Sequence, residues 1–175
     1  MRFSLPERLR ALRQEPMAAV RKMGVTKGQR VMDIGAGLGY FTIPAAAIVG
    51  GTGIVYAIEP DPARSEKISK RITNEGVKNV SVLTAGAEEL GGIPSGCIDL
   101  AFSAFSLHHF KDRKAALSEI KRVLRSGGVF YVWDRIPGGI IRHGTRAEEL
   151  NTISEGFASF ELLDAKRTLR ARFTK

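Results

Sequence analysis

A glycine-rich turn between a strand-like run and a helical pattern constrains the fold of this chain more than any other feature of its sequence. Residues 31–34 read Val-Met-Asp-Ile, and glycines follow at Gly35, Gly37 and Gly39. Glycine adopts positive φ without steric cost and lets a backbone approach a ligand closely. The segment therefore predicts a buried strand, a ligand-binding turn and the start of a helix, which together form the opening unit of an α/β sheet.

The same alternation of short strand and helical pattern continues along the chain. Ile68 and Ile72 lie one helical turn apart, and a second apolar stripe in the segment 117–124 belongs to a helix rich in Lys and Arg. Strands that are mostly continuously apolar fit a parallel sheet with helices on both faces. Five such strands are expected, at residues 30–34, 54–59, 80–83, 98–103 and 129–133.

Glycines also mark the predicted end of a buried helix. The segment 38–49 is almost wholly apolar, and Gly50 and Gly51 suit its termination. Residues 1–24 are predicted to form an N-terminal helical cap that covers the sheet or the site. With 175 residues, the chain is long enough for one core but too short for two ordinary domains, so residues 1–175 are expected to form a single domain.

The C-terminal part predicts a loop, a short helix and two strands. Thr145 is expected to cap the helix, with Glu148 at the capping-box position. The segments 159–163 and 167–173 are separated by a turn-like pair of residues. They predict an antiparallel hairpin at the edge of the sheet.

The composition limits the kinds of partner. The formal net charge is +9, and such a charge attracts anions through its long-range field. No apolar stretch reaches the roughly 20 residues of a membrane span, and the first ten residues do not resemble a secretory signal. A cytoplasmic protein with no membrane partner is therefore expected. The single cysteine, Cys97, excludes an internal disulfide and a multi-thiolate metal site.

Two carboxylates stand at the ends of the first two predicted strands. Asp33 immediately precedes the glycine turn, where it would repel a pyrophosphate but attract an ammonium or sulfonium group. Glu59 ends the second strand, at about the separation from which an acid accepts hydrogen bonds from ribose hydroxyls. Since the carboxyl ends of adjacent parallel strands meet at one edge of a sheet, both acids are expected beside the same ligand.

Together these motifs resemble those of the class I S-adenosylmethionine-dependent methyltransferases. Residues 33–39 resemble the family's first motif, residues 98–103 and 107–110 its fourth-strand motif, and residues 122–128 its turn into the fifth strand. The resemblance runs almost end to end. It implies a three-layer, Rossmann-like α/β fold whose seven-stranded, mostly parallel sheet ends in an antiparallel C-terminal hairpin. The implied cofactor is S-adenosylmethionine, and the implied product is S-adenosylhomocysteine.

The resemblance also implies a cofactor site. The glycine turn would contact the methionine part, and Glu59 would hold the ribose. Many relatives have an Asp for the adenine amino group where this chain has Gly86, so adenine would rest on neighbouring backbone such as Ala87. The implied cofactor residues are Asp33, Gly35, Ala36, Gly37, Gly39, Tyr40, Glu59, Pro60, Gly86, Ala87, Glu88 and Ser103.

Residues that follow the fourth and fifth predicted strands are candidates for the methyl-acceptor site. His108 and His109 could bind the acceptor, and His108 could act as the catalytic base. Phe105 could line the acceptor pocket, and Arg135 could hold an anionic acceptor by a forked hydrogen bond. The structural alternatives are a satisfied histidine, a core aromatic ring, and a surface ion pair between Asp134 and Arg135.

The sequence thus predicts methyl transfer to an unidentified acceptor, and the compact chain favours a small molecule. RNA or another polyanion is the alternative suggested by the charge. A protein that binds S-adenosylmethionine without catalysis is a further alternative, suggested by Gly86. The glycine spacing disfavours an NAD-dependent oxidoreductase. The single thiol disfavours arsenite methylation, and no metal site is expected, because the adjacent His108 and His109 seldom converge on one ion.

Overall fold

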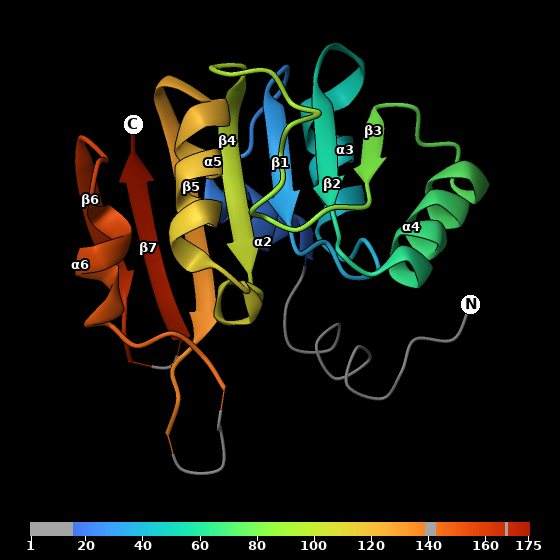
Figure 1. Ribbon diagram of the computed structural model, residues 1–175. Coiled ribbons are helices and arrows are strands. Elements are labelled where there is room, and N and C mark those ends of the chain that lie inside the picture. The colour runs from blue at the N-terminus through green and yellow to red at the C-terminus, as the bar shows by residue number, and fades with distance from the viewer. Residues whose placement is uncertain (1–15, 139–142, 167) are drawn as a thin grey trace.

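The computed structural model describes residues 16–138, 143–166 and 168–175, and it shows one sheet with helices packed on both faces (Figure 1). In chain order the elements are α2 (Pro16–Met23), β1 (Arg30–Ile34), α3 (Thr42–Val49), the short 3-10 helix η1 (Gly50–Thr52), β2 (Ile54–Ile58), α4 (Pro62–Asn74), β3 (Val80–Leu83), β4 (Ile98–Ala104), the 3-10 helix η2 (Leu107–His109), α5 (Arg113–Val123), β5 (Leu124–Arg135), α6 (Glu149–Ser154), β6 (Ser159–Asp164) and β7 (Thr168–Thr174).

The seven strands lie in the order β3-β2-β1-β4-β5-β7-β6. The first five are parallel, whereas β7 runs antiparallel between β5 and the edge strand β6. The predicted seven-stranded sheet and its antiparallel C-terminal hairpin are therefore confirmed. The strand order reverses between β1 and β4, and open α/β sheets bind their ligands at such a switch point.

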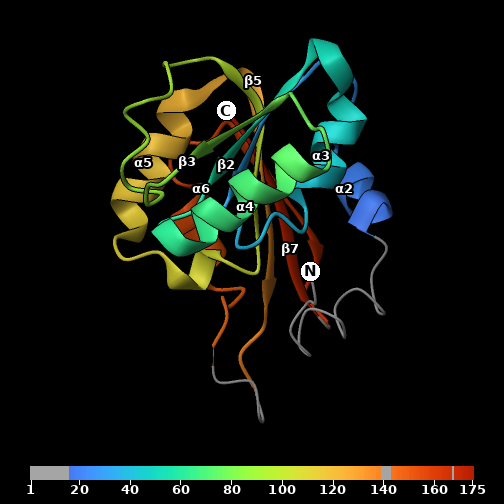
Figure 2. The ribbon, with the colours of Figure 1, turned by 90° about the vertical axis from the view of Figure 1, so that its right-hand side faces the viewer.

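Figure 2 shows the sheet edge-on between α2 and α3 on one side and α5 and α6 on the other. Side chains alternate between the two faces along each strand. In β5, Phe130 and Val132 pack into the cluster under α5 and α6, whereas Tyr131 and Trp133 pack toward α2 and α3. Because both faces are covered, β4 is buried from Leu100 to its end, which explains its continuously apolar sequence.

Helix α3 begins later than the sequence predicts. It starts at Thr42 rather than at residue 38, because the segment 35–41 still turns. Its predicted end is confirmed: Gly50 adopts a φ of 66°, and its N–H donates to the carbonyl of Ala46. The glycine turn therefore extends to residue 41, further into the apolar segment than the sequence pattern predicts.

The predicted capping role of Thr145 is wrong. Helix α6 begins at Glu149, and its N-cap residue Glu148 makes no side-chain capping bond. The Thr145 hydroxyl instead donates to the buried carboxylate of Asp134 at 2.8 Å, and the backbone N–H of Arg146 donates to Glu149 at 2.7 Å. A long-range partner thus satisfies the hydroxyl that the local pattern assigned to the helix.

Part of the predicted N-terminal cap is helical. Residues 16–23 form α2, which buries Ala19, Val20 and Met23 in the cluster shared with α3. Residues 1–15 of the predicted cap lie outside the described residues. Within the described part of the chain, no helix is both long and apolar enough to cross a membrane.

The position of β4 at the centre of the sheet predicts the cost of truncating its core side chain. Phe102 is 0% exposed, so Phe102→Ala is expected to lower the free energy of unfolding by about 3–5 kcal/mol, measured by urea denaturation. Phe160 on the edge strand is 43% exposed, and Phe160→Ala is expected to cost about 1 kcal/mol or less. Equal losses in the two variants would contradict the difference in burial between the central strand and the edge strand.

Candidate functional site

The glycine turn lies at the carboxyl end of β1 and contains three residues with positive φ. Gly35, Gly37 and Gly39 have φ values of 76°, 62° and 75°. The backbone N–H groups of Gly35 and Ala36 both donate to the carbonyl of Ile58, at 2.9 and 3.0 Å. The turn is therefore tied to the end of the neighbouring strand β2.

The surroundings of two of these glycines differ. A Cβ built on Gly35 would overlap the side chain of Ser106, whereas nothing lies within 4 Å of a Cβ built on Gly37. The Ser106 hydroxyl donates to the carbonyl of Ile34 at 2.5 Å and lies 2.7 Å from the hydroxyl of Ser103. Gly35 thus lets the loop after β4 pack against the turn, and Gly37 leaves the backbone open to a ligand.

Glu59 lies buried beside the turn, with 3% of its surface exposed. Its Oε2 accepts the N–H of Gly37 at 2.8 Å, and its Oε1 accepts the N–H of Asp61 at 3.1 Å. Asp61 in turn caps α4 by accepting the N–H of Ala63 at 2.8 Å. Each oxygen of a carboxylate has a second lone pair. Glu59 can therefore accept two further hydrogen bonds while it holds the turn.

Asp33 lies buried at the end of β1, in surroundings that oppose its ionisation. It is 2% exposed, and its Oδ2 accepts the hydroxyl of Thr42 at 2.6 Å. Burial raises the pKa of Asp33 to about 7; the Thr42 hydrogen bond acts in the opposite direction, and the charge of Glu59 adds to the increase. A positively charged ligand group near this carboxyl would favour its ionised form.

The loop after β3 lies at the same edge of the sheet and contacts the residue before α5. The Oε1 of Glu88 accepts the N–H of Asp112 at 3.0 Å, one residue before α5 begins. A Cβ built on Gly86 would overlap the Glu88 carboxylate. Ala87 is 5% exposed and packs in the larger core cluster, whereas Pro60 on the neighbouring strand end is exposed.

A second group of polar residues surrounds the fully buried carboxylate of Asp134. Among the described residues, it accepts hydrogen bonds from the Thr145 hydroxyl at 2.8 Å and from the backbone N–H groups of Arg135 and His108 at 2.8 and 3.2 Å. The Nδ1 of His108 lies 2.8 Å from Oδ1. Because the carboxylate accepts, Nδ1 carries the proton, and a neutral imidazole then has its lone pair on Nε2.

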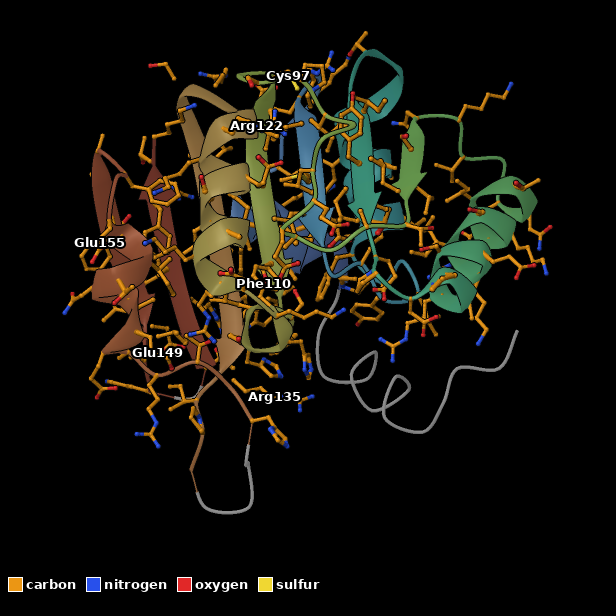
Figure 3. The ribbon with its side chains drawn as sticks, in the orientation of Figure 1. Cys97, Phe110, Arg122, Arg135, Glu149 and Glu155 are labelled. Atoms are coloured by element: carbon orange, nitrogen blue, oxygen red, sulfur yellow. The ribbon has the colours of Figure 1, made fainter. Side chains whose placement is uncertain are left out.

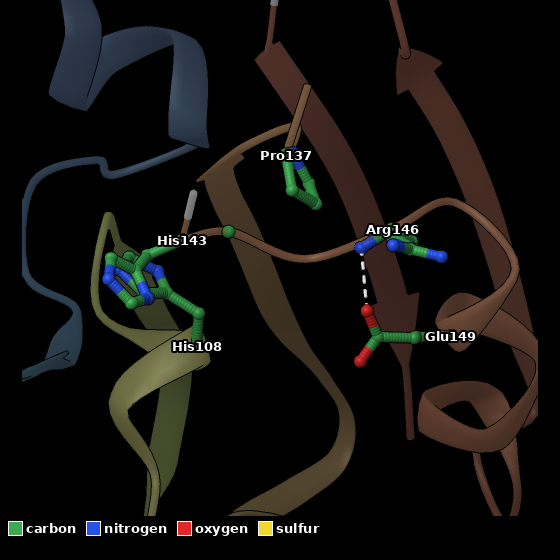
Figure 4. Close-up of a pocket in the computed structure, with 6 residues that line it drawn as sticks. His108, Pro137, His143, Arg146 and Glu149 are labelled. Carbon is green, nitrogen blue, oxygen red and sulfur yellow. Dashed lines mark hydrogen bonds between the residues drawn. The ribbon is translucent and has the colours of Figure 1, made fainter. Parts of the chain in front are cut away.

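His108 also lines a cavity of about 220 Å³ (Figure 4). Figure 4 shows His108 beside His143 on one side of this cavity, and Arg146 and Glu149 on the other. Glu149 is paired with Arg113, which with the Arg146 backbone N–H helps to hold the pKa of Glu149 below its usual value against the effect of burial. The cavity is therefore polar, and neither the glycine turn nor Glu59 lines it.

His109 lies next to this group but is exposed. Its ring centroid is 4.0 Å from that of His108. Partial burial lowers the pKa of His109, and the positive charge of a protonated His108 lowers it further, while Asp134 acts in the opposite direction. His109 is therefore mostly neutral near neutral pH.

Aromatic rings lie at the carboxyl end of the parallel strands, on the face of β5 that packs toward α2 and α3. Phe105 has a φ of 59° and is the sole non-glycine residue with positive φ in the described ranges. Its ring centroid lies 4.9 Å from that of Trp133. The guanidinium of Arg135 lies 6.0 Å from the Phe105 ring, and that of Arg170 lies 5.0 Å from the Trp133 ring. Figure 3 shows Arg135 at this end of the sheet and Cys97 at the opposite end.

The structure brings the predicted residues into two groups. One contains Asp33, the glycine turn, Glu59 and Ser103; the other contains Phe105, His108 and Arg135. The alternative of a surface ion pair between Asp134 and Arg135 is excluded, because Asp134 is fully buried and the Arg135 guanidinium lies over Phe105.

Sequence reasoning gave no site role to Thr42, Ser106 or Arg170, and it assigned Thr145 to a helix cap. Their partners are brought to them by the fold: Ser106 bonds to a carbonyl 72 residues away, and Thr145 to a carboxylate 11 residues away. No motif marks such pairs. The one available signal was the short distance of 9 residues between Asp33 and Thr42, which lie on either side of the glycine turn.

Residues 32–132 match the model of a family described as methyltransferase domain. The chain is 36% identical over 101 residues to aklanonic acid methyltransferase DauC of Streptomyces sp. strain C5, covering 58% of this chain and 46% of that protein. It is 37% identical over 106 residues to the ubiquinone/menaquinone biosynthesis C-methyltransferase UbiE of Psychromonas ingrahamii, covering 60% and 42%. The chain therefore spans less than half the length of these curated relatives.

Solved structures share the fold. A SAM-dependent methyltransferase from Aquifex aeolicus has a TM-score of 0.80 at 22% identity, covering 99% of this chain and 98% of that one. The YcgJ protein from Bacillus has a TM-score of 0.78 at 14% identity, covering 91% and 97%. At these identities the similarity establishes the fold alone.

The raised pKa of Asp33 predicts how pH changes the stability of the unliganded protein. The folded state holds this proton up to about pH 7, whereas the unfolded chain releases it near pH 3.8. The free energy of unfolding should therefore fall as pH rises between these values, by about 1.4 kcal/mol per pH unit. Asp33→Asn removes this titration, so the stability of the variant relative to the wild type should increase from pH 5 to pH 8.

Urea denaturation at several pH values measures this difference. Asp61→Asn, which changes an exposed acid on the neighbouring strand end, serves as the matched control and should not show the same trend. Parallel stability curves for the wild type and Asp33→Asn would show that Asp33 does not titrate as expected.

Proposed function

Because the chain belongs to the methyltransferase domain family, we propose that it transfers a methyl group from S-adenosylmethionine to a small-molecule acceptor. The observation that carries this proposal is the joined carboxyl edge of β1, β2 and β4. There the N–H of Gly37 donates to the buried Glu59, and the space beside the Gly37 Cα is open. Ser106 packs against Gly35 at the same edge. This is the switch point of the sheet, at which α/β folds bind nucleotide-like ligands.

The residues at this edge fit S-adenosylmethionine. Glu59 has a second lone pair on each oxygen for ribose hydroxyls, and the open side of Gly37 admits the ligand. Asp33 is a buried carboxyl that a nearby sulfonium or ammonium charge would hold in its ionised form. We assign cofactor contact to Asp33, Gly35, Ala36, Gly37, Gly39, Tyr40, Glu59, Pro60, Gly86, Ala87, Glu88 and Ser103.

When bound, S-adenosylmethionine supplies a methyl group that its positively charged sulfur already activates. The protein then mainly has to align the acceptor and exclude water. In this proposal His108 removes a proton from the acceptor; the contact of its Nδ1 with Asp134, which leaves the lone pair on Nε2, supports this role. Asp134 is then a positioning residue, since it is fully buried and contacts His108.

Two observations support a small-molecule acceptor. The names of two relatives, aklanonic acid methyltransferase and ubiquinone/menaquinone biosynthesis C-methyltransferase, refer to small molecules. Phe105 and Arg135 supply an aromatic surface and a positive charge at the same end of the sheet.

Transfer of labelled methyl from S-adenosylmethionine into a cell extract tests this function. The extract is afterwards separated into nuclease-sensitive polymer, protein and small-molecule fractions. Label among small molecules is the expected result. Label in the nuclease-sensitive fraction would instead favour RNA as acceptor, and tight binding of S-adenosylhomocysteine with no transfer to any fraction would favour a protein without catalysis.

The Asp134–His108 pair predicts the effect of removing the base. His108→Asn keeps an amide N–H that can donate to Asp134 but lacks Nε2, so kcat should fall by about 10²- to 10⁴-fold while the KM for S-adenosylmethionine stays unchanged. Asp134→Asn should also lower kcat, because it no longer selects the same imidazole tautomer.

Two controls separate this loss from misfolding. Both variants should bind S-adenosylhomocysteine with wild-type affinity in calorimetry, and Lys114→Gln, which changes an exposed side chain on α5, should keep full activity. An undiminished kcat for His108→Asn would eliminate the proposed base.

A further inference from the structure

We propose that the methyl acceptor is a planar anion, which binds beside the Phe105 ring, next to Trp133, and is attracted by the guanidinium groups of Arg135 and Arg170. This inference rests on the proposed function, because it names the chemical class of acceptor for the same site. It draws on four features of these residues: their stacking, the backbone strain at Phe105, an unsatisfied indole N–H, and weakly neutralised charge.

The four side chains form a continuous row. Arg135 lies over Phe105, the Phe105 ring contacts that of Trp133 at a tilt of 47°, and Arg170 lies over Trp133. Trp133 and Arg170 are direct partners in the antiparallel register of β5 and β7. Aromatic faces favour planar ligands, and guanidinium groups favour planar anions such as carboxylates. The row therefore offers both kinds of contact.

The backbone at Phe105 is strained in a way that holds this row next to the cofactor edge. A positive φ at a bulky residue costs about 1–3 kcal/mol and persists where the surrounding structure enforces it. Here the Phe105 N–H donates to the carbonyl of Trp133 at 2.7 Å, and the flanking Ser103 and Ser106 are bonded to each other. Because Ser106 packs against Gly35, the aromatic surface adjoins the glycine turn.

Trp133 has a hydrogen-bond donor without an acceptor. Its side chain is 6% exposed, and Nε1 has no hydrogen-bond partner among the described residues. Leaving a buried N–H unsatisfied costs about 1–3 kcal/mol. The Nε of Arg172 shares this state, and Arg172 lies on the same face of the sheet as Trp133 and Arg170. Since Nε1 is fully buried, an oxygen of a bound ligand would satisfy the indole only after the neighbouring Phe105 or Arg170 side chain moves aside.

The charge of the row is only weakly neutralised. Arg135 is exposed and makes no ion pair with a carboxylate in the described part of the chain. Among the described residues, the nearest carboxylate to Arg170 is that of Asp164, at 3.9 Å. By contrast, Arg125 at the opposite end of β5 pairs with Asp99 at 2.6 Å. The row therefore attracts an anion and repels a protonated amine.

Trp133 is the single tryptophan of the chain, so its fluorescence reports on this surface directly. Three probes of similar shape and different charge are benzoate, benzamide and benzylammonium. Each is titrated into the full chain in the presence of saturating S-adenosylhomocysteine. Benzoate should change the Trp133 fluorescence and bind about tenfold more tightly than benzamide, and benzylammonium should bind most weakly.

Variants identify the residues responsible. Arg135→Gln and Arg170→Gln should each weaken benzoate binding about five- to tenfold and leave benzamide binding unchanged. Arg125→Gln is the matched control and should leave the affinity for benzoate unchanged. Trp133→Phe keeps a ring but loses the N–H, so calorimetry should show weaker benzoate binding.

The outcomes separate this inference from the proposed function. Equal binding of the three probes, or no effect of Arg135→Gln and Arg170→Gln, would overturn the anionic acceptor even if labelled methyl is transferred. Failure of S-adenosylhomocysteine to bind in calorimetry would overturn the proposed function itself, and the inference with it.

Discussion

The Ser106 side chain occupies the space that a Cβ on Gly35 would fill, and its hydroxyl donates to the carbonyl of Ile34. This contact joins the carboxyl ends of β1 and β4, which are adjacent strands at the switch point of the sheet. On one side it supports the glycine turn, in which the N–H of Gly37 donates to Glu59. On the other side it places the loop that carries Phe105 and His108. The proposed donor and acceptor regions therefore share one structural support.

Three buried acids around this support have different roles because their hydrogen-bond partners differ. Glu59 accepts two backbone N–H groups and thereby holds the glycine turn. Asp33 has one hydroxyl partner and a neighbouring acid, so burial dominates and its pKa is raised to about 7. Asp134 accepts hydrogen bonds from Thr145, from His108 and from backbone, and it orients an imidazole. In the proposed function, one aspartate thus faces the positive charge of the cofactor and another positions a base, according to the donors that the fold supplies.

Much of the fold was predictable, because burial on both faces leaves a direct trace in a strand's sequence. The ranges of β1 and β3 match the predicted ones, and β4 differs by one residue. The errors have local causes. Helix α3 begins after the predicted residue because the glycine turn extends into an apolar segment, and Thr145 does not cap α6 because Asp134 takes its hydroxyl. Helical periodicity cannot distinguish a turn from a helix when both are apolar. A capping pattern does not show that a residue elsewhere in the chain, here Asp134, accepts the hydrogen bond of the capping side chain.

By itself, the sequence determined the α/β class, the glycine turn and the two acids that flank it, because these depend on hydrophobic periodicity and on residues close together in the chain. Only the tertiary structure decided that Ser106 closes on Gly35, that Asp134 binds His108 and not the side chain of Arg135, and that Arg170 faces Trp133. Such pairs lie on different strands or loops, and the free energy of burying or satisfying them depends on the register of the sheet. That register is a property of the packed chain, which no local segment of the sequence contains.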